Sequence, residues 1–256
     1  MKKKIVYLVP LLILFFFSLS CTGDLEVRKR QAIASRNLGE SFMMQGKHTA
    51  ALNEFIKAKE LFPDDPYLYY DLGLVYMAKE KPELAVLNLK KAIELKADFA
   101  SAKNSLGAVY LVKEDWDKAI AIFKEVVQDL LYATPHYPLS NLGFAYFSKK
   151  EFGLAEKYYL EALGKDPEYV IAWRGLGRTY LATDRASKAV EAFEKAIRLS
   201  PNTTQLYMDL GNACKITRDF KKAYKAYAKV IELDPEGPLN KEARKQSAPL
   251  EKFTRD

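Results

Sequence analysis

The 256-residue sequence contains very little cysteine, histidine or tryptophan, with two residues of each type. Two cysteines are too few for a disulfide framework, and two histidines provide little for a histidine-based metal site. Glycine (12) and proline (11) are too scarce for a collagen-like or low-complexity chain. The composition is 49% hydrophobic and 29% charged, which is typical of a folded, soluble protein with a substantial core.

The formal net charge of +7 is concentrated at one end of the chain. Three of the positive charges belong to Lys2, Lys3 and Lys4, and subtracting them from +7 leaves +4 for the remainder. That remainder is not a nucleic-acid-binding signature by itself. The Tyr (16) and Phe (14) residues mostly fall on the repeat positions described below, so they do not indicate base stacking. We expect no nucleic-acid partner.

The sequence also lacks a full membrane span in its N-terminal apolar run. Residues 5–17 are apolar except for Pro10, and they are shorter than the roughly 20 residues that cross a bilayer. The run follows three lysines and ends in Ser18-Leu19-Ser20-Cys21, so residues 1–20 are predicted to be a signal peptide. An uncleaved anchor and an ordinary secretory cleavage nearby are the alternatives, and each of them also exports the chain.

The position of Cys21 resembles the lipobox of bacterial lipoproteins, in which the cysteine becomes the lipidated first residue of the mature chain. Ser18 departs from that pattern, which usually has an aliphatic residue there. The resemblance implies a lipid on Cys21 and, because Thr22 follows, an outer-membrane location facing the periplasm. Residues 21–31 are then predicted to be a lipidated tether. With Cys21 modified, Cys214 is the only remaining thiol, so no intramolecular disulfide is expected.

A Leu-Gly dipeptide recurs through the rest of the chain at intervals of 34, 34, 36, 34 and 34 residues. The six copies are Leu38-Gly39, Leu72-Gly73, Leu106-Gly107, Leu142-Gly143, Leu176-Gly177 and Leu210-Gly211. Each glycine is followed at fixed spacing by an alanine and then by a Phe, Tyr or Leu residue. A period of 34 with these positions is typical of the tetratricopeptide repeat, a hairpin of two helices. The small residues let the two helices approach closely, and we expect the rings to fill the space between adjacent hairpins.

The predicted fold is therefore all-α, a right-handed superhelix (α-solenoid) of six helical hairpins. A single repeat cannot bury its apolar face alone, so stability has to come from stacking neighbours. The predicted repeats cover residues 32–237, as 32–65, 66–99, 100–135, 136–169, 170–203 and 204–237. Residues 238–256 are polar and are predicted to form a solvating C-terminal cap that frays toward its end.

Two extra residues separate repeats three and four, where the segment 128–135 reads QDLLYATP. Together with the lipobox and the six repeats, this insertion resembles the type IV pilus biogenesis/stability lipoproteins, the pilotins of the outer-membrane secretin. The residues that match their Asp-x-Leu-Tyr-x-Thr-Pro pattern are Asp129, Leu131, Tyr132, Thr134 and Pro135. The resemblance implies a membrane-anchored assembly factor whose protein client is a secretin subunit. The alternative is a different envelope lipoprotein that recruits or regulates a cell-wall or envelope enzyme.

The first helices of tetratricopeptide hairpins usually line the concave groove in which partners bind. The predicted groove residues are Tyr67, Tyr70, Leu74, Met77, Asn104, Tyr137, Phe144, Phe147, Arg174 and Arg178. This groove suits an amphipathic helix or an extended peptide, and the two arginines can hold a carboxylate. Alternatively, the rings are half-buried packing residues and the arginines form a solvated face. Asn104 and Ala108 do not match the Lys/Asn clamp of chaperone-cochaperone repeats, so that mode is disfavoured.

The residue inventory does not predict an enzyme, a cofactor or a metal site. His48 and His136 lie in different repeats, and neither stands in a nucleophile–base grouping. Residues 46–49 lack the glycine and hydroxyl positions of a phosphate-binding loop, and Asp64-Asp65 lacks the spacing of a calcium loop. The expected partners are a protein client and, through the lipid, a membrane. The sequence leaves the oligomeric state open.

Overall fold

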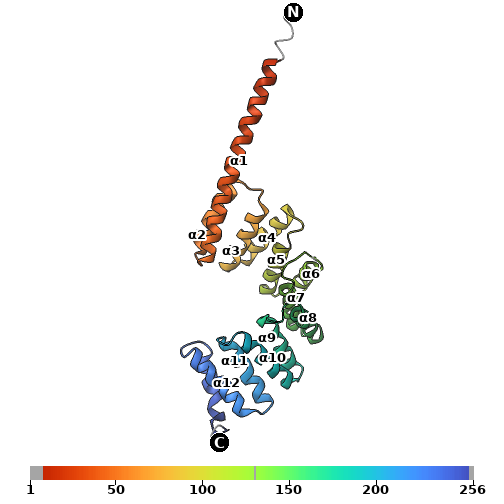
Figure 1. Cartoon of the computed structure of the whole chain (residues 1–256), viewed down its shortest axis with the longest axis vertical. Helices are drawn as coiled ribbons and strands as arrows, with labels where there is room; N and C mark the ends of the chain where they lie inside the picture. Colours follow the sequence, from red (N-terminus) through yellow and green to blue (C-terminus); the bar gives the residue numbers. More distant parts are fainter. Residues whose placement is uncertain (1–7, 130, 254–256) are drawn as a thin grey trace, which may run out of the picture. The chain divides into compact units, whose positions relative to one another are not determined.

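The computed structural model describes residues 8–129 and 131–253, with side chains described from Asp24 onward. Within these ranges the chain forms α-helices, one short 3-10 helix and no strand, which confirms the predicted all-α fold (Figure 1). The predicted signal peptide and Cys21 lie outside the residues whose side chains are described. Among the described residues, no helix combines the length and apolar character needed to cross a membrane.

The helices group into two compact units, residues 1–113 (unit 1) and 114–256 (unit 2). Unit 1 contains α1 (Leu8–Met44), α2 (His48–Leu61), α3 (Pro66–Ala78), α4 (Pro82–Leu95) and α5 (Ala100–Val112). Unit 2 contains α6 (Trp116–Gln128), α7 (His136–Ser148), α8 (Phe152–Lys165), α9 (Val170–Ala182), α10 (Ala186–Leu199), α11 (Thr204–Ile216), α12 (Phe220–Leu233), α13 (Asn240–Ser247) and the 3-10 helix η1 (Ala248–Phe253). The boundary falls in the third repeat, so its two helices belong to different units.

Five of the six repeat glycines lie directly against a large side chain from the second helix of their hairpin. A Cβ added at Gly39, Gly177 or Gly211 would lie 2.5 Å from a ring carbon of Phe55, Phe193 or Tyr227, and real Cβ atoms do not approach that closely. The six alanines that follow the glycines are completely buried: Ala51, Ala85, Ala119, Ala155, Ala189 and Ala223. Small residues are therefore required by the packing, as the sequence predicted. The rings lie over the glycine of their own hairpin, and the Tyr159 ring also meets Gly175 of the next hairpin, as expected of a ring between hairpins.

The turns inside the hairpins share one backbone geometry. The residue after the C-cap of the first helix adopts a positive φ at Gly46, Glu80, Glu114, Lys150, Asp184 and Arg218. The next amide donates back to the first helix, as from Lys81 N–H to the Tyr76 carbonyl at 2.8 Å. This bond is the signature of a Schellman turn, which satisfies carbonyls left open at a helix C-terminus. The same turn in successive hairpins explains the regular spacing of the repeats.

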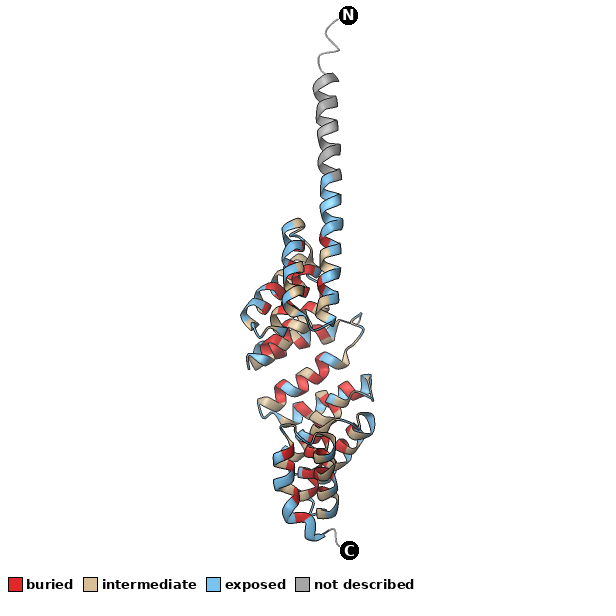
Figure 2. Cartoon of the chain, turned by 90° about the vertical axis from the view of Figure 1, so that its left-hand side faces the viewer, coloured by how far each residue is buried: buried red, intermediate tan, exposed pale blue. Residues whose placement is uncertain are grey.

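The segments predicted as a tether and as a C-terminal cap both contain helix. The helix α1 continues without a break through residues 21–31, so the segment predicted as a tether is helical and extends beyond its partner α2 (Figure 1). At the other end, Ala243 of α13 and Leu250 of η1 are buried in the same cluster as Tyr227 of α12. The C-terminal segment therefore covers the last hairpin with apolar side chains as well as polar ones. Buried residues recur along the helices of both units in Figure 2.

The insertion before repeat four forms a short connection between α6 and α7. Asp129 holds it from one side, since its carboxylate accepts the Leu131 N–H at 3.0 Å and its carbonyl accepts the Tyr132 N–H at 3.1 Å. Leu131 is 92% exposed. The insertion therefore lies on the surface, where the repeat pattern places extra residues.

Candidate functional site

A pocket of about 430 Å³ opens in unit 2. Its lining comes from the first helices of repeats four, five and six, namely α7, α9 and α11, with Tyr159 of α8 behind them. The lining residues are Ser140, Asn141, Phe144, Tyr159, Val170, Ile171, Arg174, Gly175, Arg178, Thr203, Gln205 and Leu206. The volume lies in the usual range of about 300–1,000 Å³ for small-ligand pockets. Three predicted groove residues, Phe144, Arg174 and Arg178, are brought together here.

Gly175 leaves room above the ring of Tyr159. A Cβ at this position would overlap the Tyr159 ring, so any side chain would force the tyrosine to move. Tyr159 also packs against Gly143 of its own hairpin and is only 3% exposed. Burial raises the pKa of its hydroxyl. The uncharged Tyr159 ring therefore forms a fixed floor of the pocket.

The two arginines of the pocket have different surroundings. Arg174 Nε donates to Asp209 Oδ2 at 2.5 Å, and Gln205 Nε2 donates to Asp209 Oδ1 at 3.1 Å. Arg178 instead lies over Phe147, with its guanidinium carbon 4.9 Å from the ring centroid. Arg178 is exposed, as the alternative of a solvated face expects, whereas Arg174 is half-buried and paired with α11.

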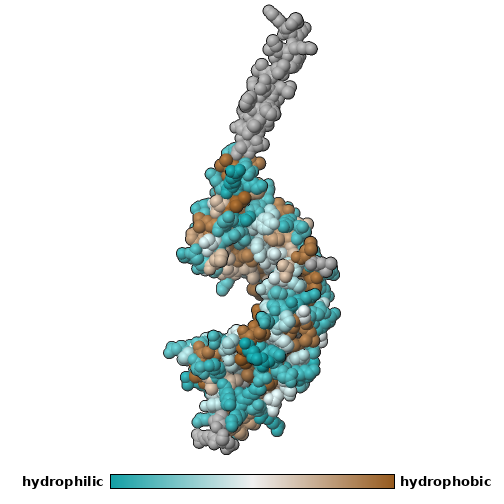
Figure 3. Space-filling view, in the orientation of Figure 1, coloured by the Kyte–Doolittle hydropathy of each residue, from teal (hydrophilic) through white to brown (hydrophobic). Residues whose placement is uncertain are grey.

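The aromatic residues of repeat four have different degrees of exposure. Phe144 is 37% exposed and meets Trp116 edge to face at 6.0 Å between centroids. Phe147 is half-buried, and its ring lies 5.5 Å from that of Phe152. Ile171 on α9 is 61% exposed at the pocket rim. Figure 3 shows hydrophobic surface at the position of α9, with hydrophilic surface beside it.

Tyr137 lies outside the pocket lining and packs in an aromatic cluster. Its ring is 4.2 Å from that of His136 and 5.4 Å from that of Tyr169. His136 Nε2 lies 3.8 Å from Asp166 Oδ2. Burial raises the pKa of Tyr169 to about 12. This cluster holds the start of α7 against the turn that precedes α9.

The other predicted groove residues belong to unit 1, where the aromatic ones pack together. Tyr67 and Tyr70 each lie 5.1 Å from the ring of Phe99, and the Tyr67 hydroxyl accepts a hydrogen bond from Lys96 at 2.9 Å. Leu74, Met77 and Asn104 are half-buried. The Asn104 side-chain oxygen is buried and has no hydrogen-bond partner among the described residues. Tyr70 is half-buried, as the packing alternative expects, whereas Tyr67 is 44% exposed although its ring contacts Phe99.

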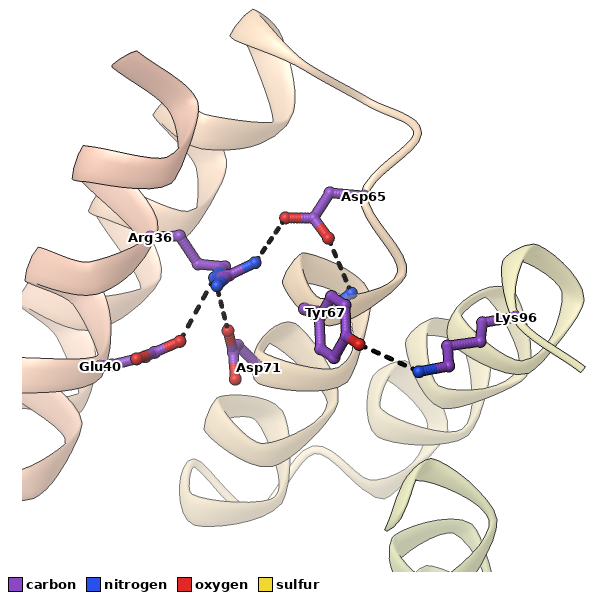
Figure 4. Close-up of polar contacts among 6 residues, drawn as sticks. All are labelled: Arg36, Glu40, Asp65, Tyr67, Asp71 and Lys96. Carbon is purple, nitrogen blue, oxygen red and sulfur yellow. Dashed lines mark hydrogen bonds and ion pairs between the residues drawn. The ribbon is translucent and has the colours of Figure 1, made fainter. Parts of the chain in front are cut away.

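An ion-pair network fills the unit 1 surface between α1 and α3 (Figure 4). Arg36 donates to Asp65 at 2.7 Å and to Glu40 at 3.3 Å, and its Nε lies 3.7 Å from Asp71 Oδ2. Burial and the Glu40 carboxylate raise the pKa of Asp71 to about 8, while Arg36 opposes the shift. The positive charge of Arg36 is thus paired with carboxylates of the chain itself.

Arg36–Asp71 and Arg174–Asp209 are equivalent pairs in the repeat pattern. In both, the arginine lies on the first helix of one hairpin and the aspartate 35 residues later on the first helix of the next. One repeat period plus one residue separates the partners. Sequence reasoning placed Arg174 in the groove but missed Asp209, although this spacing carried the signal. It also missed Gly175 and Tyr159 as the reason for the pocket.

Metal-binding groupings are not found in the part of the chain that the structure describes. No three His, Cys, Asp or Glu residues there are placed to hold a metal ion. Cys214 is buried in the core of the last hairpins, and burial raises the pKa of its thiol to about 11. A thiol in that state is a poor nucleophile at neutral pH. The pocket lining itself offers apolar side chains and the two arginines Arg174 and Arg178.

The fold and this pocket define a repeat scaffold for protein interaction. The tetratricopeptide repeat family matches residues 70–138 and 141–204, which is more than half of the chain, and related repeat descriptions match residues 39–80 and 204–236. The chain belongs to the tetratricopeptide repeat family.

Among solved structures, the chain is similar to PilW, described as a widely conserved type IV pilus biogenesis factor. The TM-score is 0.77 at 19% identity, covering 82% of this chain and 97% of PilW. PilF of Pseudomonas aeruginosa gives a TM-score of 0.74 at 18% identity, covering 86% of this chain and 99% of PilF. Cut9 in the APC/C Cut9–Hcn1 hetero-tetramer also gives 0.74, at 16% identity, but only 43% of that chain is covered. At these identities the likeness establishes the fold alone.

A curated relative in sequence is Superkiller protein 3 of Saccharomyces cerevisiae. It is 35% identical over 69 residues, which is 27% of this chain. The chain spans only about 5% of the length of this relative. The match reflects shared repeats.

Proposed function

We propose that the protein is a membrane-anchored, non-enzymatic assembly factor for outer-membrane secretin in type IV pilus biogenesis. It binds a secretin subunit in the periplasm and brings it to the membrane where subunits multimerise. The lipid on Cys21 anchors the protein in the membrane, and the repeats bind the client.

The observation that carries this proposal is the extent of the structural likeness to PilW and PilF. Nearly the whole of each of those two chains is matched, at 97% and 99%, whereas less than half of the Cut9 chain is matched. A match of the complete repeat set, together with the lipobox-like Cys21, supports the same type of protein. A match of repeats alone would support any scaffold with this fold.

The mechanism needs no chemical step. A scaffold that holds its client and is itself held at a membrane raises the local concentration of client at that membrane. A single lipid-modified cysteine with more than one acyl chain provides stable anchoring, since one chain alone gives only marginal binding. Oligomerisation of the client then proceeds by mass action at the membrane surface.

The test is the amount of heat- and detergent-resistant secretin multimer in outer-membrane fractions. Deleting the gene is expected to remove the multimers and to leave monomer, while other outer-membrane proteins remain normal. The Cys21→Ser variant is expected to fold normally but to leave the membrane fraction and to lower the multimer level. Persistence of multimers in the deletion strain would disprove the secretin role. The client would then be sought among cell-wall and envelope enzymes.

A further inference from the structure

We propose that the unit 2 pocket binds a peptide segment in which an apolar side chain stands next to a carboxylate. The apolar side chain sits over Tyr159 and Gly175, and Arg178 holds the carboxylate. The inference rests on the protein-binding function proposed above and specifies the chemistry that the client presents.

The charge of the pocket comes from Arg178. Arg174 is neutralised by Asp209, whose second oxygen is already occupied by Gln205. Within residues 24–129 and 131–253, no carboxylate lies within ion-pair distance of Arg178. One uncompensated positive charge therefore remains beside an apolar pocket. A ligand with a single negative charge complements that arrangement, whereas a phosphate-rich ligand would need several cations.

The geometry of Arg178 suits a carboxylate in particular. The guanidinium is held over the Phe147 ring at 4.9 Å, and Phe147 is supported by Phe152 at 5.5 Å. A guanidinium that contacts a ring keeps N–H donors that can bind both oxygens of a carboxylate. The aromatic support also limits the rotamers of the arginine, which lowers the entropy lost when a ligand binds.

The apolar part of the pocket lies on the same helix as this charge. Ile171, Gly175 and Arg178 are spaced by four and three residues on α9, so they share one helix face. Phe144 from α7 and Leu206 from α11 complete the apolar wall. A side chain that enters beside Gly175 therefore places the neighbouring backbone or side-chain carboxylate near Arg178.

The test uses three fluorescein-labelled probe peptides and fluorescence anisotropy with the full chain purified in detergent. The first is a Gly/Ser hexapeptide that ends in Leu-Phe with a free C-terminal carboxylate, and the second is its C-terminal amide. The third ends in Leu-Phe-Glu amide, so its carboxylate is on a side chain. At least one acidic peptide is expected to bind about tenfold or more tightly than the neutral amide. The better acidic probe distinguishes a chain terminus from an internal acidic residue.

Matched variants assign the effect to the pocket. Arg178→Gln is expected to abolish the advantage of the acidic peptide, and Arg178→Lys is expected to restore part of it. Arg198→Gln removes the same charge from an exposed position in the last turn of α10 and is expected to leave the advantage intact. Ile171→Asp places a negative charge at the exposed rim and is expected to weaken both acidic peptides more than the amide.

Equal binding of acidic and neutral peptides, or equal losses for Arg178→Gln and Arg198→Gln, would overturn the inference. Lack of binding by all three peptides would overturn it as well. None of these outcomes depends on the multimer assay. If multimers require the gene while the peptides fail, the proposed function stands and the pocket inference falls. If the peptides bind as expected but multimers persist, the pocket inference stands and the secretin role falls.

Discussion

At the scale of single residues, two glycines with open space around them differ in backbone conformation. Gly46 adopts a φ of +70° in the first hairpin turn, and a Cβ there would meet no atom within 4 Å. Gly164 lies in α8, and a Cβ there would also meet open space. The backbone conformation alone therefore decides whether alanine at each of these two positions raises or lowers the free energy of unfolding.

We expect Gly46→Ala to lower the free energy of unfolding by about 1 kcal/mol, because alanine is strained at positive φ. Gly164→Ala is expected to raise it by about 0.5 kcal/mol, since alanine loses less conformational entropy in a helix. Urea unfolding monitored by circular dichroism measures both changes. The same sign for the two variants would contradict this account.

The buried carboxyl group of Asp71 predicts a pH dependence of stability. Its pKa is raised to about 8 in the folded chain, against about 3.9 for an unperturbed aspartate. Between about pH 4 and pH 8, the folded state therefore binds this proton more tightly than the unfolded state does. Stability from this group is complete below about pH 4 and is lost as the pH rises toward 8.

Asp71→Asn removes this titration while keeping the shape of the side chain. Relative to wild type, the variant is expected to gain about 1 kcal/mol or more of unfolding free energy between pH 5 and pH 8. Denaturant titrations at both pH values give the comparison. Asp209→Asn at the equivalent repeat position is the control, because it removes an ion pair and should lower stability at both pH values. A constant difference between Asp71→Asn and wild type would exclude the effect.

At the scale of elements, α7 contributes two phenylalanines with different functions. Phe144 is 37% exposed at the pocket, whereas Phe147 packs between Phe152 and Arg178. Both were predicted to be groove residues from the same repeat pattern. The structure assigns Phe144 to the pocket wall and Phe147 to the support beneath Arg178.

Phe144→Ala is expected to weaken binding of the acidic probe peptide about fivefold or more while lowering the unfolding free energy by only about 1 kcal/mol. Phe147→Ala is expected to weaken binding and to cost more stability, about 2 kcal/mol, since its ring is more enclosed. Anisotropy and thermal unfolding on the same samples measure the two effects. Unchanged binding in a folded Phe144→Ala, Phe147→Ala double variant would rule out this part of α7 as a binding surface.

At the scale of the whole molecule, the repeat architecture could be predicted almost completely from the sequence. Each hairpin depends on local spacing, such as Gly39 with Phe55, and the same spacing recurs in every unit of the pattern. The pocket could not be predicted in the same way. It depends on Tyr159, Gly175 and Asp209 from three different repeats, and on Arg174 being already paired. Those relations become visible only when neighbouring hairpins are placed side by side.

The ends of the array were harder to predict for a related reason. Residues 21–31 are charged and polar, which is compatible with either a tether or an exposed helix, and the repeat pattern does not extend to them. The C-terminal segment 238–256 is polar overall, but Ala243 and Leu250 are spaced to meet the last hairpin. A few apolar residues were enough to order it, because the final hairpin offers an apolar surface that no further repeat covers.

The unbroken course of α1 has a mechanical consequence for the membrane anchoring proposed above. At 1.5 Å per residue, the eleven steps from Cys21 to Ala32 would set the first hairpin about 16 Å from the attachment point of the lipid proposed above. A helix resists bending, whereas a flexible linker does not. The helix would therefore fix both the distance and the orientation of the repeats relative to the anchor. Adding one residue to residues 22–31 would turn the repeats by about 100° around the helix axis relative to the anchor. The distance and orientation at which a client is held relative to the membrane would then depend on the number of residues in this segment.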